Sequence, residues 1–595
     1  MLNFLPTGSL LESYRRWCRF ALAAGLLLLP LSLQAAEPEI DIQGGSKSLQ
    51  NNIRSFLPFA DHGCETPPWR LRSLLRDSAP RIAQAAQALG YYHLSYTSDI
   101  THEKDCWKLS LKLEPGEPVR VDEVRLVVTG EGAADKVFEA IFKEPDIKKG
   151  DRLNHGRYET LKGRFSSLAT ARGYFDGRFE IAEVKVNLKE NLARVALVYN
   201  TGPRYRLGEI TINQDILDED FVRRYLNIAP GDEFEAEKLL QLKTLYGASN
   251  YFALASITPN LQSLHDGVVP VTIQLDERKR RSYSIGAGAD TDTGPRLRLG
   301  FEDRYVTSTG HYFGANAQLS KVHSNLEAAY TIPLKRPAYQ YLRFLSGYQF
   351  EDISDRRSDL YRVGVSYSNF QENQWLVTYA LNYEREYSRL GDEPENRTDL
   401  LIPSVQLTRS RTDGNPYPLK GWRLQSRLSG SPETLGSDFS FLQFHGQAKY
   451  IHSLGSGRLL LRTEVGSTRV SEFSQVPLSV RFFAGGDQSV RGYSYKSIGT
   501  EDESGRVIGG RHLLTASVEY DYRIKPQWAL AAFYDQGDAA ENFEFDFKRS
   551  VGIGVRWISP IGPVRIDIAC ALDGVRCSTG SAEGWGLHLS MGPDL

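Results

Sequence analysis

The strongest constraint on the fold is an alternation of apolar with small or polar residues through the second half of the chain. It recurs from Arg281 to Leu595 in segments of about ten residues, the length of a membrane-spanning strand. Successive side chains of a strand point to opposite faces, so each segment predicts a strand with one apolar face. The first and last segments show the pattern in these residues: Tyr283, Ile285, Gly286 and Gly288, then Trp585, Gly586, Leu587 and Leu589.

Strands of this kind fit a wall between lipid and a polar lumen. An open sheet edge in lipid would leave backbone groups without hydrogen bonds, so the sheet must close into a barrel. At roughly 20 residues for each strand and its connection, residues 281–595 allow about 16 antiparallel strands, within about 14 to 18. A water-soluble β-sandwich or propeller is the alternative, and the export signal argues against it.

The N-terminus predicts export. Three arginines between residues 15 and 19 precede an apolar stretch at residues 20–33, and small residues follow at Ala35 and Ala36. We expect residues 1–36 to be a signal peptide, with an uncleaved anchor as the alternative. Beyond residue 40 no run approaches the ~18 apolar residues of a transmembrane helix. The mature chain is therefore either soluble in the periplasm or crosses a membrane as strands.

The segment between the signal and residue 280 repeats a unit of roughly 80 residues. An aromatic pair marks each copy, at Tyr91-Tyr92, Tyr174-Phe175 and Tyr251-Phe252. An amphipathic helical pattern precedes each pair, and two alternating strands follow it. The unit is β-α-α-β-β, a small sheet covered on one face by two helices.

This unit resembles the POTRA (polypeptide-transport-associated) domain, which implies a periplasmic arm that binds proteins. The alternative is three small α+β modules of unknown use. The predicted fold class is thus three α+β POTRA repeats followed by a transmembrane antiparallel β-barrel. The predicted domains are a signal peptide at 1–36, POTRA domains at 37–118, 119–203 and 204–280, and a barrel at 281–595.

Four cysteines follow the signal: Cys64, Cys106, Cys570 and Cys577. An even number in an exported chain suggests disulfides. Pairing within each neighbourhood, Cys64 with Cys106 and Cys570 with Cys577, is the most economical of three connectivities. A metal site is poorly supported, because the cysteines show neither Cys-x-x-Cys spacing nor a nearby histidine.

The net charge does not point to a nucleic-acid partner, and the motifs do not point to an enzyme. Lys plus Arg total 71 against 73 for Asp plus Glu, so charge gives no argument for a nucleic-acid partner. We find no Gly-x-Ser-x-Gly, no His-Glu-x-x-His and no phosphate-binding loop. The sequence therefore predicts no catalytic residue, no cofactor and no metal. A Ser-His-Asp set assembled in three dimensions stays open, and a passive porin would have no use for three periplasmic domains.

The most specific motif, Arg-Phe-Phe-Ala-Gly-Gly-Asp-Gln-Ser-Val-Arg-Gly-Tyr, occupies residues 481–493. Segments around Glu519 and Asp535 follow it, and then the strand pattern of residues 551–557. This order resembles the outer-membrane assembly superfamily that includes BamA, TamA and the two-partner secretion transporters. The resemblance implies that the sixth extracellular loop folds back into the lumen and that four residues lie at its tip: Val490, Arg491, Gly492 and Tyr493. It also implies that Arg491 contacts acidic residues of the next strands, the twelfth and thirteenth.

Physical chemistry supports this arrangement. An arginine in a narrow lumen loses water and needs carboxylate partners to offset its desolvation. A planar guanidinium can bind carboxylates bidentately and so hold a long loop in one position. Gly492 permits the tight tip that directs Arg491 inward, and Tyr493 fills space against the wall. Two roles stay open for Arg491, Glu519 and Asp535: a structural clasp only, or a direct part in inserting substrates.

A second predicted element is the seam between the first and last strands. Their glycines would let them pair less firmly, so the seam could open and offer strand edges to an incoming hairpin. Glycines that face a crowded lumen would explain the same pattern. The edge strands of the POTRA repeats could bind unfolded clients in the same way, although the sequence nominates no single residue there.

Three repeats before one barrel resemble the TamA family of translocation and assembly proteins within this superfamily, because BamA-like proteins carry more repeats. The resemblance implies an outer-membrane barrel in contact with the lipid bilayer, with its POTRA domains in the periplasm. It implies unfolded outer-membrane proteins such as autotransporters as clients, and a TamB-like, inner-membrane-anchored partner. A role in lipid transport between the membranes stays open.

Overall fold

The computed structural model describes residues 37–592 except 60, 104–105, 265, 415, 561 and 574–584. The predicted signal peptide lies outside the described residues. The chain divides into two compact units. The N-terminal unit runs to Arg206 and includes Glu233–Ala236, and the barrel unit comprises Leu207–Asp232 and Glu237–Leu595.

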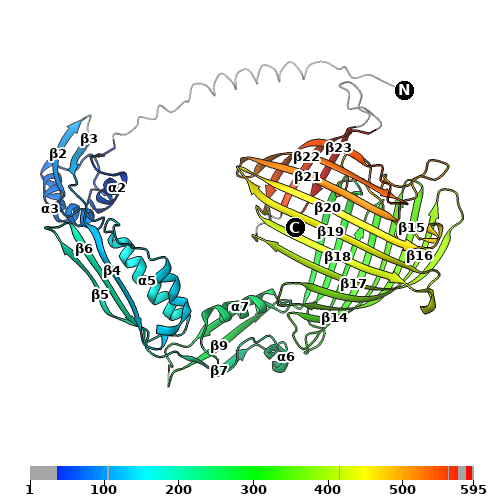
Figure 1. Cartoon of the computed structure of the whole chain (residues 1–595), viewed down its shortest axis with the longest axis horizontal. Coiled ribbons are helices and arrows are strands. Elements are labelled where there is room, and N and C mark those ends of the chain that lie inside the picture. Colours follow the sequence, from blue (N-terminus) through cyan, green and yellow to red (C-terminus); the bar gives the residue numbers. More distant parts are fainter. Residues whose placement is uncertain are drawn as a thin grey trace, which may run out of the picture. The chain divides into compact units, whose positions relative to one another are not determined.

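The first repeat is a three-stranded sheet covered by two helices (Figure 1). Its elements are β1 (Glu39–Gln43), α2 (Lys47–Phe56), α3 (Pro68–Gln87), β2 (Ser95–Glu103) and β3 (Cys106–Glu114). The strand order is β1-β3-β2, with β1 parallel and β2 antiparallel to β3. The helices bury Leu49, Ile53 and Ile82 against Leu109 and Leu111 of the central strand.

A disulfide joins Cys64 to Cys106, as the sequence predicted, with the Cα atoms 4.4 Å apart. It ties the segment before α3 to the start of β3. Cys570 is buried in the barrel wall, and Cys577 lies outside the described residues, so the second predicted pairing stays a prediction.

The second repeat has the same order, with two 3₁₀ turns added before its first helix. Its elements are β4 (Arg120–Thr129), η1 (Glu131–Ala134), η2 (Lys136–Phe138), α4 (Glu139–Lys143), α5 (His155–Ala171), β5 (Arg178–Asn187) and β6 (Leu192–Asn200). Asn154 caps α5 by accepting a hydrogen bond from the Arg157 N–H. Leu161 and Phe165, on the predicted apolar face of this helix, pack into the core beside Leu197.

The third repeat is made of β7 (Arg206–Asn213), α6 (Glu219–Arg223), α7 (Ala236–Ala248), β8 (Phe252–Pro259) and β9 (Val268–Glu277). Its strand order, β7-β9-β8, matches that of the second repeat, β4-β6-β5. The predicted apolar residues of α7, Leu239, Leu242 and Tyr246, are buried. The described residues therefore form three β-α-α-β-β units, which confirms this part of the predicted fold class.

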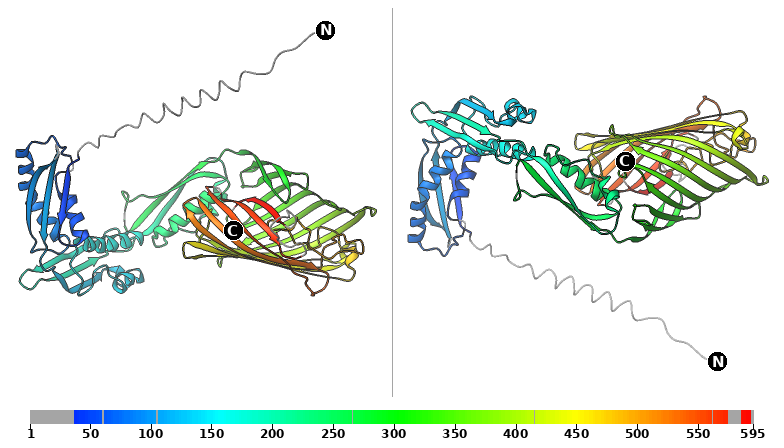
Figure 2. Two further views of the ribbon diagram at one scale, coloured as in Figure 1. Left: turned by 90° about the horizontal axis from the view of Figure 1, so that it is seen from above. Right: turned by 90° about the horizontal axis from the view of Figure 1, so that it is seen from below.

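Sixteen antiparallel strands follow in one sheet, in sequence order. Figures 1 and 2 show this sheet curved into a barrel. The number of strands agrees with the predicted value. The first eight are β10 (Arg281–Asp290), β11 (Gly294–Asp303), β12 (Tyr312–Leu319), β13 (His323–Pro333), β14 (Gln340–Ile353), β15 (Arg356–Phe370), β16 (Leu376–Leu390) and β17 (Asn396–Thr412). The last eight are β18 (Gly421–Ser431), β19 (Phe441–Leu454), β20 (Gly457–Val470), β21 (His512–Lys525), β22 (Trp528–Ala540), β23 (Lys548–Ser559), β24 (Gly562–Ala571) and β25 (Trp585–Met591). Short 3₁₀ turns, η3 (Glu433–Leu435) and η4 (Phe473–Gln475), lie in the loops.

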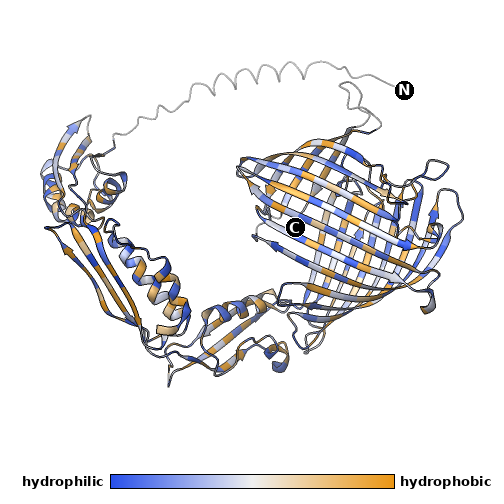
Figure 3. Cartoon of the chain, in the orientation of Figure 1, coloured by the Kyte–Doolittle hydropathy of each residue, from blue (hydrophilic) through white to orange (hydrophobic). Residues whose placement is uncertain are grey.

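The alternation in the sequence becomes the two faces of this wall. Figure 3 shows hydrophilic and hydrophobic residues alternating along the barrel strands. Tyr283 and Ile285 of β10 are 75% and 79% exposed on the outer face, where lipid would cover them. Ser517 and Glu519 of β21 are buried on the inner face. Among the described residues, no helix is both long enough and apolar enough to cross a bilayer.

The sheet begins at β10 and ends at β25, and no backbone ladder joins these two strands within the described part of the chain. A direct link is made by the Leu589 N–H of β25, which donates to Thr291 Oγ1 in the turn after β10 (3.3 Å). The barrel is therefore nearly closed, and β10 and β25 are the two edge strands of its sheet.

Candidate functional site

A long loop between β20 and β21, residues 471–511 and here called the returning loop, crosses the inside of the barrel. On one side, Lys496 of the loop pairs with Glu351 of β14 at 2.5 Å. Arg356 of β15 donates hydrogen bonds to the backbone oxygens of Lys496 (2.8 Å) and Val507 (2.9 Å). The tip of the loop contacts β21, β22, β24 and β25, which lie across the barrel. The loop joins the eleventh and twelfth strands, the position that the sequence motif implies.

Arg491, at the tip, is 4% exposed and surrounded by acceptors. Its Nε and Nη2 donate to the two oxygens of Asp535 on β22, at 2.7 and 2.9 Å. Its Nη1 donates to Glu519 on β21 (2.6 Å) and Asp567 on β24 (3.2 Å). Nη2 also donates to Ser517 Oγ at 3.3 Å. A guanidinium has five N–H groups, so each of them has an acceptor in the protein. The structure thus brings Arg491 together with both carboxylates nominated from the sequence.

The residues beside Arg491 shape the tip. Val490 is fully buried in a small apolar cluster with Phe482 and Leu513. Gly492 has φ +90°, which L-side chains rarely adopt, and a Cβ there would lie 3.2 Å from the Ala571 nitrogen. The hydroxyl of Tyr493 is 3.4 Å from the backbone oxygens of Arg549 and Asp573 on the wall.

A second buried arginine, Arg556 of β23, extends this cluster. Its Nη2 donates to Glu519 at 2.7 Å and its Nη1 to Asp567 at 2.5 Å. Glu519 and Asp567 therefore each bind both arginines. We call Arg491, Arg556, Glu519, Asp535 and Asp567 the arginine cluster. It joins the returning loop to four consecutive strands, β21 to β24.

A separate buried pair lies on the neighbouring strands. Arg458 of β20 donates to Asp521 of β21 at 2.8 Å and packs over the ring of Tyr417. The hydroxyl of Tyr417 donates to the same carboxylate at 3.0 Å. Arg556 also lies 3.6 Å from Asp521, so this pair continues the arginine cluster along the wall.

The buried arginines and carboxylates of the arginine cluster stabilise one another. Placing an ion in a low-dielectric interior costs several kcal/mol, and attraction offsets this cost only when every charge is well paired. Here the carboxylates are shared between arginines, and Phe533 covers the Arg491 guanidinium 3.3 Å from its ring centroid. Removing one member would leave its partners buried with fewer hydrogen bonds. The arrangement therefore holds the returning loop in place.

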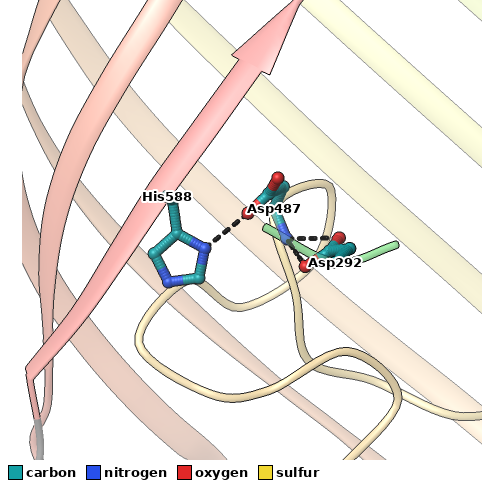
Figure 4. A group of neighbouring side chains, drawn as sticks. All are labelled: Asp292, Asp487 and His588. Carbon is teal, nitrogen blue, oxygen red and sulfur yellow. Dashed lines mark hydrogen bonds and ion pairs between the residues drawn. The ribbon is translucent and has the colours of Figure 1, made fainter. Parts of the chain in front are cut away.

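The loop tip also lies between the two ends of the sheet (Figure 4). Asp292 is in the turn after β10, Asp487 is in the loop, and His588 is on β25. One ligand atom of each lies within 4.8 Å of the others, so this group could hold a metal ion. Each of these side chains already makes a hydrogen bond within the group.

The predicted seam residues fall on β10 and β25, as expected from the alternation. Gly286 and Gly288 have room for a Cβ, whose nearest neighbours would be side-chain atoms of Arg298 and Arg296 at 3.9 and 3.5 Å. Gly586 differs, because a Cβ there would lie 2.9 Å from His588 Nε2. The outer faces carry Trp585 and Leu587, which are 48% and 61% exposed.

Sequence reasoning missed Arg556, Asp567, Asp487 and His588. A usable signal was present for two of them, since Arg556 and Asp567 occupy inner-face positions of strands whose outer faces are apolar. A charge at such a position needs a partner across the lumen. Asp487 lies within the motif quoted above, but its contact with a strand 101 residues away follows only from the path of the loop.

Comparisons with known proteins agree with this architecture. The Omp85 superfamily domain model matches residues 307–592. The first repeat matches the model of POTRA domain TamA domain 1 over residues 39–115. The third matches a POTRA model, described as a surface antigen variable number repeat, over residues 205–278.

The similar proteins include two named outer membrane protein assembly factor BamA. The one from Nitratidesulfovibrio vulgaris is 26% identical over 586 residues, covering 93% of this chain and 72% of that protein. The one from Neorickettsia risticii is 23% identical over 577 residues, covering 91% and 76%. The crystal structure of BamA from Haemophilus ducreyi lacking POTRA domains 1–3 has a TM-score of 0.63 at 16% identity, covering 80% of this chain and 99% of that one, a likeness of fold.

Proposed function

Because this chain is an outer-membrane protein of the Omp85 superfamily, with POTRA domains before its barrel, we propose that it assembles other β-barrel proteins into the outer membrane. The observation that carries the proposal is the seam, where β10 and β25 face each other without a backbone ladder. Edge strands present unpaired N–H and C=O groups, which are a template for another strand.

The seam would act by strand addition. A client hairpin in the bilayer has backbone groups that lipid cannot satisfy, and each unsatisfied group costs several kcal/mol. Pairing with β10 or β25 would satisfy them, as β-augmentation does in soluble complexes. The room beside Gly286 and Gly288 supports this role, since crowding does not account for glycine there. Crowding does account for Gly586, which lies against the loop tip.

The arginine cluster would serve as a clasp for the returning loop. All five N–H groups of Arg491 are occupied by the chain itself, so the guanidinium offers none to a client. A direct part in insertion would require the cluster to break first. If Arg491→Ala leaves the barrel folded and yet abolishes client assembly, the clasp-only role is wrong.

The arm would collect clients. In each repeat the strand that pairs antiparallel with the centre, β2, β5 or β8, forms an edge of its sheet. We assign the arm to three domains at residues 37–118, 119–203 and 204–280. Extended segments of unfolded outer-membrane proteins would add to these edges through main-chain hydrogen bonds.

The narrower version of the proposal is a TamA-like role, with autotransporters as clients and a TamB-like inner-membrane protein as partner. It is supported by the match of the first repeat to the TamA domain 1 model. A second candidate is general outer-membrane protein assembly, favoured by the names of the relatives. A deletion strain separates them: loss confined to autotransporters supports the first, and a broad loss of barrel proteins supports the second.

Linking the seam tests the central step. Ala289→Cys and Met591→Cys place thiols on the outer face of each strand, two residues from the Thr291–Leu589 contact. We expect a short bismaleimide link between them to stop client assembly, whereas an oxidative link would stop it until a reductant is added. Ala289→Cys alone is the matched control. Assembly at the wild-type rate by the linked protein would show that clients do not use the seam.

A further inference from the structure

The tip of the returning loop touches both edges of the seam, starting with the turn after β10. The Asp487 backbone N–H donates to both carboxylate oxygens of Asp292, at 3.2 and 2.9 Å. Thr291 donates its hydroxyl to Asp487 Oδ1 at 2.9 Å. The backbone N–H and the carboxylate of Asp487 thus both bind the turn after β10, the first strand of the sheet.

The same residue is bound to the last strand. Asp487 Oδ1 lies 2.5 Å from Nδ1 of His588 on β25 (Figure 4). On the other side of the imidazole, the Gly492 N–H donates to Nε2 at 2.7 Å. Both ring nitrogens of His588 are therefore held by the loop, one on each side of Arg491 in sequence.

These partners determine the state of the imidazole. A backbone N–H can only donate, so His588 Nε2 must carry a lone pair. The hydrogen of the neutral ring is then on Nδ1, from which it is donated to Asp487. His588 thus acts as donor and acceptor at once, a combination that few side chains reproduce.

Burial raises the cost of losing these hydrogen bonds. Asp487 and His588 are 8% and 7% exposed, so little water can replace their partners. A buried polar group left without a partner carries its full desolvation penalty. By contrast, among the residues that the structure describes, the two edges share one direct hydrogen bond, from the Leu589 N–H to Thr291 Oγ1. Most of the polar connection across the seam in the described residues therefore runs through the loop.

We propose that Asp487 and His588 form a latch, in which the returning loop holds the first and last strands of the barrel together, and that the seam parts only when this latch breaks. The proposal rests on the proposed function in so far as clients use the seam. Arg491 acts as a positioning residue for the latch, because its clasp on β21, β22 and β24 fixes residues 487 and 492 on either side of it.

A metal ion is the competing occupant of this group. Both oxygens of Asp292 already accept from the Asp487 N–H, and the Asp487 carboxylate already accepts from Thr291 and His588. A cation would have to displace these hydrogen bonds. The hydrogen-bonded latch explains every contact without one, and the test includes the cation as an outcome.

The experiment measures seam separation directly in the full chain in lipid nanodiscs. Spin labels on Ala289→Cys and Met591→Cys report the distance between the strands. We expect Asp487→Ala to raise the open fraction about fivefold or more, because the carboxylate loses its two buried hydrogen bonds, from Thr291 and from His588. Gln488→Ala, at the exposed neighbouring residue, is the matched control and should leave the distance unchanged.

Two substitutions of one residue separate the two bonds. His588→Asn puts an amide near Nδ1 and can still donate to Asp487, whereas His588→Gln puts it near Nε2 and can only accept from Gly492. If Asp487 carries the latch, the Gln variant opens the seam more than the Asn variant. Barrel folding is checked for each by its heat-dependent mobility on gels.

The outcomes are distinct. Unchanged distances in Asp487→Ala and His588→Gln would overturn the latch, whatever happens to client assembly. Opening of the wild-type seam by a chelator, reversed by Zn²⁺, would also overturn it in favour of a metal clasp. If the variants open the seam while the linked seam still assembles clients, the latch stands and the proposed function fails.

Discussion

At the scale of single residues, Arg491 shows how a long loop can be fixed by one side chain. Its guanidinium is bidentate to Asp535 and shares Glu519 and Asp567 with Arg556. A lysine could supply the charge but not the planar fork that matches three carboxylates at once. The fork, rather than the charge alone, is what gives the loop a single position.

The first prediction concerns this arginine. Arg491→Ala leaves Asp535 and Glu519 buried with a partner removed, so we expect the folded barrel to lose about 3–5 kcal/mol. Urea unfolding in detergent, followed by gel mobility, measures it. Arg389→Ala is the control, because Arg389 is exposed on β16 and its loss should cost less than about 0.5 kcal/mol. Equal midpoints for the two variants would mean that the cluster contributes little.

At the scale of elements, the first repeat depends on a covalent tie. Cys64 and Cys106 are 42 residues apart and connect the segment before α3 to the central strand β3. The segment between them contains α3 and β2, so the tie limits how far these elements can move when the repeat unfolds. A small domain with a modest core gains much from such a constraint.

We therefore predict a local effect of removing it. Replacing both cysteines, Cys64→Ser with Cys106→Ser, should destabilise the first repeat by about 2–4 kcal/mol. Hydrogen exchange of residues 37–114 in the full chain would rise, while exchange in β14–β17 stays the same. Adding a reductant should reproduce the rise in the wild type and have no further effect on the double variant. Exchange that does not change would mean that the core holds the repeat without the tie.

Elements also show what a sequence can reveal about this site. Alternation predicted the strands, and the order of motifs placed Glu519 and Asp535 on the two strands after the loop. The contacts of Arg556 and Asp567 were not predictable in the same way, because the inner-face residues that meet depend on strand tilt and stagger. The contact between Asp487 and His588 needs in addition the path of the loop and the near closure of the sheet.

At the scale of the whole molecule, the third repeat and the barrel share one compact unit. The Tyr251 hydroxyl donates to the Gly310 backbone oxygen, in the turn between β11 and β12, at 2.5 Å. Burial raises the pKa of Tyr251, so the hydroxyl stays a donor at physiological pH. The Asp218 N–H donates to the Ser308 oxygen of the same turn at 2.9 Å.

Truncation should reveal this division. A signal-bearing chain without residues 37–203 keeps the hydrogen bonds between the third repeat and the β11–β12 turn. We therefore expect its barrel to unfold at the wild-type urea midpoint. A chain without residues 37–280 loses these two hydrogen bonds to the turn and a third, from Ser308 Oγ to the Asp218 carboxylate, and should be less stable by about 1–3 kcal/mol. Unfolding in urea compares the two. A similar loss in both chains would contradict the division.

The missing ladder between β10 and β25 has a consequence for how such a wall can change. In an ordinary barrel, the first and last strands hold each other through their own residues, and any substitution that weakens their pairing also alters a surface facing lipid. Here the contacts that hold the two strands together are made largely by a loop that is distant from both in sequence. How readily the barrel parts can therefore be adjusted, by substitution in that loop, without altering the bilayer-facing surface.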